Sequence, residues 1–180
     1  MLEILQEIFS LQRVRDCLST DERSRFLIEE NETTNVSQII VQGVDPNHPE
    51  KCLIVNNPNQ DTINHISIDG CFLTPETEYF GEKCDLAVFN NEKFCFVELK
   101  TNAYSSSNVG NNLRKARRQL GATINYFDNE GVDFSNHNLE AIIVLRNNLY
   151  PSNQAGINER RRWFYDEYEV DLFERREITF

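Results

Sequence analysis

Residues 81–100 have the sequence GEKCDLAVFNNEKFCFVELK. Two apolar runs, each of strand length, flank the polar stretch NNEK at 90–93. Three charged residues interrupt or close these runs: Asp85, Glu98 and Lys100. Charged side chains are rare in buried strands unless they are paired or bind an ion. The stretch therefore predicts a β-hairpin that carries a functional site.

The numbering predicts which residues of this hairpin face each other. A two-residue turn at 91–92 pairs positions whose numbers sum to 183, which places Asp85 opposite Glu98. A turn one position earlier makes Glu98 a diagonal neighbour of Asp85 on the same face, whereas a three-residue loop breaks this parity unless a bulge restores it. Lys100 follows Glu98 by two positions and therefore shares its side of the sheet.

This trio of side chains suggests a metal site. Two adjacent carboxylates repel each other unless a proton or a cation lies between them, and oxygen ligands suit Mg²⁺ or Mn²⁺. A metal bound to Asp85 and Glu98 lowers the pKa of a bound water, and the ammonium group of Lys100 orients that water or stabilises charge on a phosphate. The trio predicts hydrolysis assisted by a divalent metal.

The same residues carry a resemblance to a known family. Residues 83–85 (KCD) and the segment 94–100 (FCFVELK), with twelve residues between Asp85 and Glu98, resemble the core of the PD-(D/E)XK nuclease superfamily, which has the restriction-endonuclease-like fold. The resemblance covers residues 60–146 and implies that Asp85, Glu98 and the backbone carbonyl of Leu99 bind Mg²⁺ or Mn²⁺. It also implies that Lys100 is the catalytic lysine and that the substrate is DNA in preference to RNA.

A basic helix is predicted directly after this motif. Apolar residues recur at helical spacing between Val109 and Phe127, and no acidic residue occurs from 101 to 127. Basic side chains crowd two turns of this helix and predict contact with a phosphate backbone: Arg114, Lys115, Arg117 and Arg118. The alternative is that they pair with neighbouring acids. Several branches of the superfamily place a glutamine on this helix near the active site, which makes Gln119 a candidate catalytic residue.

The rest of the chain is predicted to complete one α/β domain over residues 1–180, with a mixed central sheet flanked by helices. Its parts are an N-terminal region of helices and strands (1–58), the catalytic core (60–146), and a C-terminal helix with edge strands (147–180). One amphipathic helix is predicted from Leu2 to Val14, and a capping box at Ser19 and Glu22 predicts a second helix that ends near Glu30. Asp69-Gly70 predicts a turn, with Asp69 as an additional acidic candidate.

Composition limits the partners and the compartment. The formal net charge of −11 and the isoelectric point near 4.7 disfavour long-range attraction to a polyanion. Five scattered cysteines without a C-x-x-C pair predict reduced thiols in a cytoplasmic protein, without a disulfide framework or a zinc site. The sequence contains no run of about 18 apolar residues, so no membrane span is predicted.

Two classes of function follow. The first is a metal-dependent nuclease that hydrolyses phosphodiester bonds, with a protein partner as one possible source of nucleic-acid affinity. The alternative is a nuclease-fold module of weak or absent activity that serves protein–protein interaction, and a mimic of nucleic acid is a third hypothesis. The sequence leaves open whether the chain forms a homo-oligomer.

Overall fold

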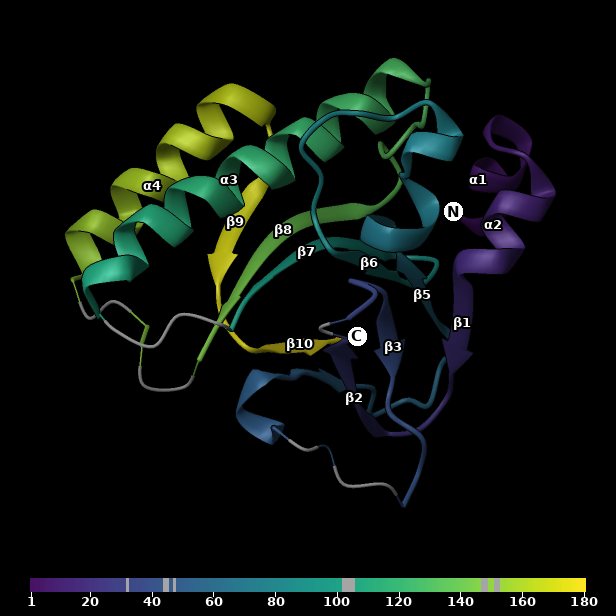
Figure 1. Cartoon of the computed structure of the whole chain (residues 1–180), viewed down its shortest axis with the longest axis horizontal. Helices are drawn as coiled ribbons and strands as arrows, with labels where there is room; N and C mark the ends of the chain where they lie inside the picture. The colour runs from purple at the N-terminus through teal and green to yellow at the C-terminus, as the bar shows by residue number, and fades with distance from the viewer. Residues whose placement is uncertain (32, 44–45, 47, 102–105, 147–148, 151–152) are drawn as a thin grey trace.

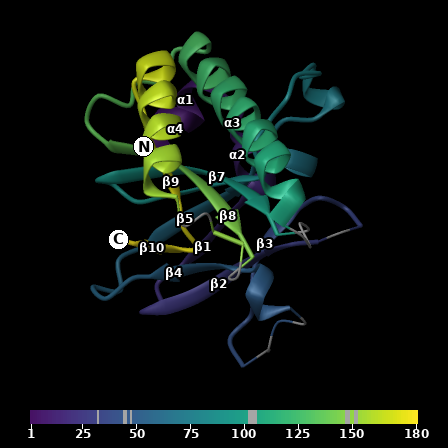
Figure 2. The ribbon, with the colours of Figure 1, turned by 90° about the vertical axis from the view of Figure 1, so that its left-hand side faces the viewer.

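The computed structural model places the helices in one layer, a six-stranded sheet in the middle and a four-stranded sheet beneath it (Figures 1 and 2). It describes the chain except residues 32, 44–45, 47, 102–105, 147–148 and 151–152, and of residues 106–107 it describes only the backbone. The predicted α/β class is confirmed for the described residues. Helices flank one face of the six-stranded sheet, whereas the four-stranded sheet covers its other face.

The six-stranded sheet has the order β1-β5-β6-β7-β8-β9. Its strands are β1 (Leu18–Asp21), β5 (Ile63–Ser67), β6 (Leu86–Phe89), β7 (Lys93–Lys100), β8 (Asn138–Leu145) and β9 (Asp171–Glu174). The pairs from β1 to β7 are antiparallel, whereas β8 pairs in parallel with both β7 and β9. The sheet is therefore mixed, as the sequence predicts, and β6–β7 is its hairpin.

The four-stranded sheet has the order β10-β4-β2-β3. Its strands are β2 (Arg25–Glu30), β3 (Ser37–Ile39), β4 (Leu53–Asn56) and β10 (Glu177–Thr179). The last strand of the chain thus pairs, in parallel, with a strand from its first third. A polar chain of hydrogen bonds joins the two sheets, since buried His65 in β5 bonds to Ser19 in β1 and to Ser37 in β3, each at 2.9 Å.

The helices are α1 (Leu2–Ile8), α2 (Leu11–Cys17), α3 (Ser106–Asn129) and α4 (Gln154–Tyr168). Short helical turns occupy Pro49–Lys51, Ile68–Phe72 and Pro75–Thr77. Helix α3 packs on the six-stranded sheet through every apolar position that its periodicity predicts: Val109, Leu113, Ala116, Leu120, Ile124 and Phe127. Phe96 of β7 meets Phe127 edge to face, with ring centroids 5.2 Å apart.

Alternation along the central strands separates two cores. In β7, Phe94 and Phe96 pack under the helices, whereas Cys95, Val97 and Leu99 pack against the four-stranded sheet. Side chains of a strand alternate between faces. The continuous apolar character of β6, β7 and β8 follows from burial on both faces.

Two predictions for the N-terminal region are wrong. The region from Leu2 to Val14 forms two helices, because the chain turns at Phe9 and the Ser10 hydroxyl accepts a hydrogen bond from the Arg13 amide at the start of α2. The helix predicted between Ser19 and Glu30 is absent, and these residues contribute to β1 and β2 instead. Cross-strand partners far along the chain override the local capping signal.

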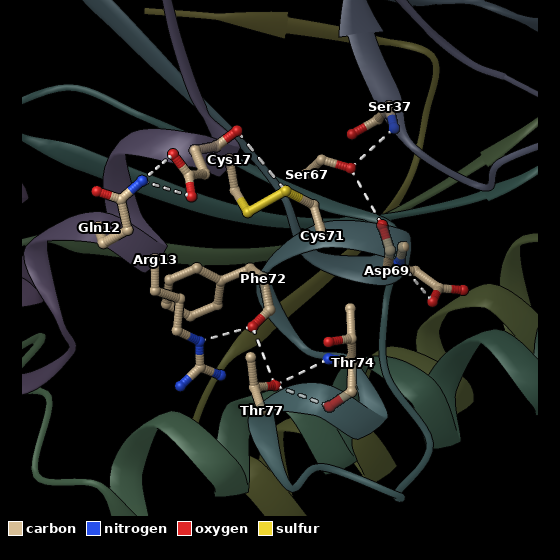
Figure 3. Close-up of a disulfide and its surroundings, with 12 residues drawn as sticks. Gln12, Arg13, Cys17, Ser37, Ser67, Asp69, Cys71, Phe72, Thr74 and Thr77 are labelled. Atoms are coloured by element: carbon tan, nitrogen blue, oxygen red, sulfur yellow. Dashed lines mark hydrogen bonds between the residues drawn. A yellow bond between two sulfur atoms is a disulfide. The ribbon is translucent and has the colours of Figure 1, made fainter.

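The cysteine prediction is wrong for one pair. Cys17, at the end of α2, forms a disulfide with Cys71 in the turn Ile68–Phe72 (Figure 3). In the same view, the Arg13 side chain donates a hydrogen bond of 2.7 Å to the Phe72 carbonyl oxygen. Cys52, Cys84 and Cys95 are free and buried. The disulfide removes the cysteine argument for a reducing compartment.

Within the described residues, no helix has both the length and the apolar character needed to cross a membrane.

Candidate active site on the β6–β7 hairpin

The hairpin has the register expected for a turn at 91–92. Leu86 pairs with Val97 and Phe89 with Phe94, so the paired positions sum to 183. The Asn90 side chain shapes the turn, because its oxygen accepts hydrogen bonds from the Glu92 and Lys93 amides at 2.9 and 2.8 Å. The observed register is therefore the first of the alternatives that the numbering allowed.

Asp85 departs from the regular ladder just before β6 begins. Its amide donates to the Val97 carbonyl oxygen at 3.2 Å, one position out of the hairpin register. Its carboxylate, and not a main-chain carbonyl, accepts the hydrogen bond of the Leu99 amide at 2.5 Å. Asp85 thus lies beside Glu98 without completing a regular cross-strand pair with it. An irregularity of this kind redirects a side chain at the end of a strand.

Glu98 and Lys100 lie on the helix-facing side of β7, in line with Phe94 and Phe96. Glu98 is fully buried, with 0% of its surface exposed. Its Oε1 forms an ion pair with the Lys100 ammonium group. Among the described residues, nothing donates a hydrogen bond to its Oε2. The site therefore holds an orphaned acceptor in a position shielded from water, where such an atom is costly.

Burial dominates the electrostatics of the two acids. Burial raises the pKa of Asp85 to about 6, and the Leu99 amide, Lys100 and Lys115 only partly offset it. Burial and the neighbouring Asp85 carboxylate raise the pKa of Glu98 well above its usual range, against the effect of Lys100. Two buried carboxylates with a single paired lysine favour uptake of a proton or a cation.

Two hydrogen bonds from the turn that follows β5 hold the main chain of Asp85 in place. The amides of Ile68 and Asp69 both donate to the Asp85 carbonyl oxygen, at 2.9 and 3.2 Å. The Asp69 carboxylate accepts from the Gly70 amide, as predicted for a turn, and lies 3.4 Å from the Lys83 ammonium group. The sequence indicated Asp69 as a candidate but did not predict its ion pair with Lys83. The only sequence signal for Lys83 is that it lies two residues before Asp85.

Helix α3 is tied to the same segment by two side chains. The Gln119 amide nitrogen donates to the Lys83 carbonyl oxygen at 2.9 Å, and its Oε1 is buried without a partner among the described residues. The Thr123 hydroxyl accepts from the Cys84 amide at 2.8 Å. In this structure Gln119 positions the strand that carries Asp85. Thr123 is a positioning residue that sequence reasoning missed, since a hydroxyl within a helix carries no specific signal.

The four basic residues of α3 do not act as one surface. Lys115 lies close enough to Asp85 to lower the pKa of that carboxyl. Arg118 pairs with Glu82 at 2.6 Å, as the alternative of pairing with neighbouring acids predicts. Arg114, Arg117 and Arg118 line a cavity against α4. Lys115 is therefore the basic residue of this set that lies near Asp85, whereas the three arginines lie on the side of α3 that faces α4.

The oxygen ligands of the site suit a hard divalent ion, although they are few. No group of three or more His, Cys, Asp or Glu side chains gathers around one point in the described parts of the chain. A metal here would depend on the carboxylates of Asp85 and Glu98, completed by main chain and water. The amide and carbonyl of a strand residue point to the same edge of the strand, so the Leu99 carbonyl oxygen is expected on the edge of β7 that faces Asp85. The orphaned Glu98 Oε2 is consistent with such an ion.

Comparisons with protein-family models, with curated proteins and with solved structures gave no significant match.

Proposed function

We propose that this protein is a metal-dependent phosphodiesterase that acts on nucleic acid, with the PD-(D/E)XK nucleases as the superfamily it resembles. The observation that carries the proposal is the meeting of Asp85, Glu98 and Lys100 at one end of the β6–β7 hairpin, with Glu98 Oε2 buried and unpartnered. The helix α3 that follows β7, and the parallel strand β8 that follows α3, are consistent with the core implied by the resemblance.

Each residue has a distinct role in this proposal. Asp85, Glu98 and the Leu99 carbonyl would hold Mg²⁺ or Mn²⁺, which supplies a Lewis acid and an activated water when bound. Release of the Lys100 ammonium group from Glu98 would free it to orient that water or to stabilise charge on the phosphate. The raised pKa of Asp85 means that its carboxylate is fully available only above about pH 6. DNA remains the proposed substrate in preference to RNA.

Cleavage assays test the proposal with matched variants. Purified protein is incubated with plasmid and oligonucleotides in Mg²⁺ or Mn²⁺, alongside Asp85→Asn and Lys100→Met. The controls Asp128→Asn and Lys93→Met make the same changes of charge, on the exposed face of α3 and at the opposite end of β7. We expect each site variant to lose at least about 100-fold in rate and each control to retain activity. Equal activity in site and control variants would remove the assignment.

Thermal unfolding provides a readout that does not require activity. A ligand that binds only the folded chain at about 100 times its Kd contributes about 2.7 kcal/mol. For a chain of this size we expect Mn²⁺ to raise Tm by about 5–10 °C. The shift should disappear in the double variant Asp85→Asn/Glu98→Gln and persist in Asp128→Asn. An identical shift in the double variant would place the metal elsewhere.

One observation favours the second candidate function, a nuclease-fold module for protein–protein interaction. Lys100 already pairs with Glu98, and the Asp85 carboxylate already accepts the Leu99 amide, so both acids have partners within the chain. The net charge of −11 points the same way. This function predicts no Mn²⁺ shift, no cleavage, and co-purification with a specific protein.

A further inference from the structure

A basic cavity lies between helices α3 and α4, which run side by side in Figures 1 and 2. Its volume is about 590 Å³, within the range of cavities that hold nucleotide-sized ligands. The lining residues are Arg114, Arg117, Arg118, Gly156, Glu159, Arg160 and Trp163. We call this cavity the α3–α4 groove. Four of its seven lining residues are arginines, on a chain whose net charge is strongly negative.

Arg117 is the central feature of the groove. Its guanidinium lies 5.8 Å from the centre of the Trp163 ring. Its Nη1 is buried and has no hydrogen-bond partner among the described residues. Burial lowers the pKa of Arg117, and the nearby cation Arg160 lowers it further. A partly buried guanidinium with an unused buried donor, next to another cation, is poorly compensated until an anion joins it.

The charges along the groove are unevenly compensated. Arg160 forms a bidentate pair with Glu174 at 2.7 and 2.9 Å, and Arg118 pairs with Glu82. Arg114 is exposed and forms no ion pair with any described residue. Arg114 and Arg117 therefore offer donors three positions apart on one face of α3. Two arginines with this spacing fit the oxygens of one or two phosphates.

Trp163 supplies a second kind of contact. Its ring is half exposed, at 49%, although the residue lies on a helix that buries Phe164 completely. An exposed indole beside arginines is a platform on which a base can stack. Stacking of this kind requires an unpaired base, because a duplex covers both faces of each of its bases.

We propose that the α3–α4 groove binds single-stranded nucleic acid, with Arg114 and Arg117 contacting the phosphates and Trp163 stacking on a base. The proposal rests on the nuclease function, which it deepens by naming a single-stranded substrate. Lys115 follows Arg114 directly in α3 and is the cation of this helix that acts on Asp85. The groove residue Arg114 is therefore next in sequence to the cation of α3 that lies nearest Asp85, which places the groove beside the proposed site.

The groove carries its own spectroscopic probe, because Trp163 is the only tryptophan of the chain. We would titrate the 180-residue chain with oligothymidylate in the presence of a metal chelator and follow tryptophan fluorescence. The expected result is saturable quenching by the single strand, with much weaker quenching by a duplex of equal length and by thymidine monophosphate. Quenching by the duplex at equal affinity would overturn the single-strand assignment. Equally tight binding of the mononucleotide would overturn the assignment to a strand.

Matched arginine variants assign the contacts. We expect Arg114→Ala and Arg117→Ala each to weaken binding about tenfold and to reduce the slope of log Kd against log salt by about 0.7. Arg162→Ala is the control, because Arg162 lies on α4, is 85% exposed and does not line the groove. An equal loss in Arg162→Ala, or no quenching by the wild-type protein at low salt, would overturn the proposal.

The chelator separates this test from the test of hydrolysis. We expect Asp85→Asn to bind oligothymidylate as the wild-type protein does while losing cleavage. Binding without any cleavage by the wild-type protein in Mn²⁺ would refute the proposed hydrolysis and leave the groove assigned. Cleavage without tryptophan quenching would refute the groove alone.

Discussion

At the scale of single residues, the chemistry of the site depends on how strongly burial opposes the charge of Asp85. Only 5% of this residue is exposed, and the hydrogen bond from the Leu99 amide is the main interaction that stabilises its negative charge. Raising its pKa from 3.8 to about 6 means that the folded chain holds this proton more tightly than the unfolded chain. The contribution to stability is therefore full below pH 3.8 and is lost as the pH rises through 6.

The variant Asp85→Asn tests whether ionisation of the Asp85 carboxyl destabilises the folded protein. Asparagine cannot ionise, and its side-chain oxygen can still accept the Leu99 amide. In the absence of divalent metal, we expect the free energy of unfolding of the variant to exceed that of the wild-type protein by about 3 kcal/mol above pH 6. The difference should shrink toward zero near pH 4. Urea unfolding at a series of pH values measures it.

The buried imidazole of His65, whose pKa is lowered to about 4 by burial, titrates in the same range. It does so in both proteins, so it cancels in their difference. A difference between Asp85→Asn and wild type that does not change with pH would show that the Asp85 carboxyl is not perturbed by burial.

At the scale of elements, α3 connects the site to the groove. One face carries the apolar residues that pack on the sheet, and the next holds the strand of Asp85 through Gln119 and Thr123. A third face meets α4, where Gly121 lies against the Tyr168 ring. A Cβ atom at Gly121 would come within 2.3 Å of the Tyr168 hydroxyl oxygen, so a larger residue here would displace the Tyr168 ring.

Two glycines of α3 allow a matched comparison. Among the described residues, no atom lies within 4 Å of the position that a Cβ at Gly110 would occupy, so Gly110→Ala should stabilise the protein by about 0.5–1 kcal/mol through helix propensity alone. Gly121→Ala gains the same propensity but displaces the Tyr168 ring, which packs on Phe164 with ring centroids 4.7 Å apart. We expect Gly121→Ala to be less stable than Gly110→Ala by about 1–3 kcal/mol. Chemical denaturation of both variants measures the difference, and equal stabilities would contradict the packing of α3 on α4.

At the scale of the whole molecule, the N-terminal helices are fastened to the segment that supports Asp85. The disulfide joins Cys17 to Cys71 across 54 residues, and the turn that contains Cys71 begins with the amides that bond to the Asp85 carbonyl oxygen. The cross-link therefore restrains the unfolded chain over nearly a third of its length. It also limits how far this turn can move away from the site.

Reduction of the disulfide should destabilise the protein by about 2–4 kcal/mol, because a long loop regains its freedom in the unfolded state. We expect three reactive thiols in the unfolded, unreduced protein, from Cys52, Cys84 and Cys95, and five after reduction. Thiol titration and urea unfolding with and without reductant measure both effects. The double variant Cys17→Ser/Cys71→Ser is the control and should not respond to reductant. Five thiols before reduction would show that the disulfide does not form.

The hairpin formed by β6 and β7 and the packed face of the helix that follows it were predictable from local patterns in the sequence. The register of β6 and β7 follows from the Asn90 turn and from alternation, and the packed face of α3 follows from its apolar spacing. These features depend on residues close together in the chain, so local patterns are sufficient to predict them. Asp85, Glu98 and Lys100 were brought together for the same reason.

The other features of the fold depend on contacts between segments that are far apart in the chain. The region between Ser19 and Glu30 forms strands because β1 pairs with β5 and β2 pairs with both β4 and the nearby β3. The pairings with β5 and β4 join residues more than twenty positions apart, and together these pairings outweigh a local capping signal. The contacts of α3 with Lys83 and Cys84, the disulfide between Cys17 and Cys71 and the α3–α4 groove all depend on contacts between distant segments. Such contacts form only when the whole chain buries its apolar surface, and local propensity carries no record of them.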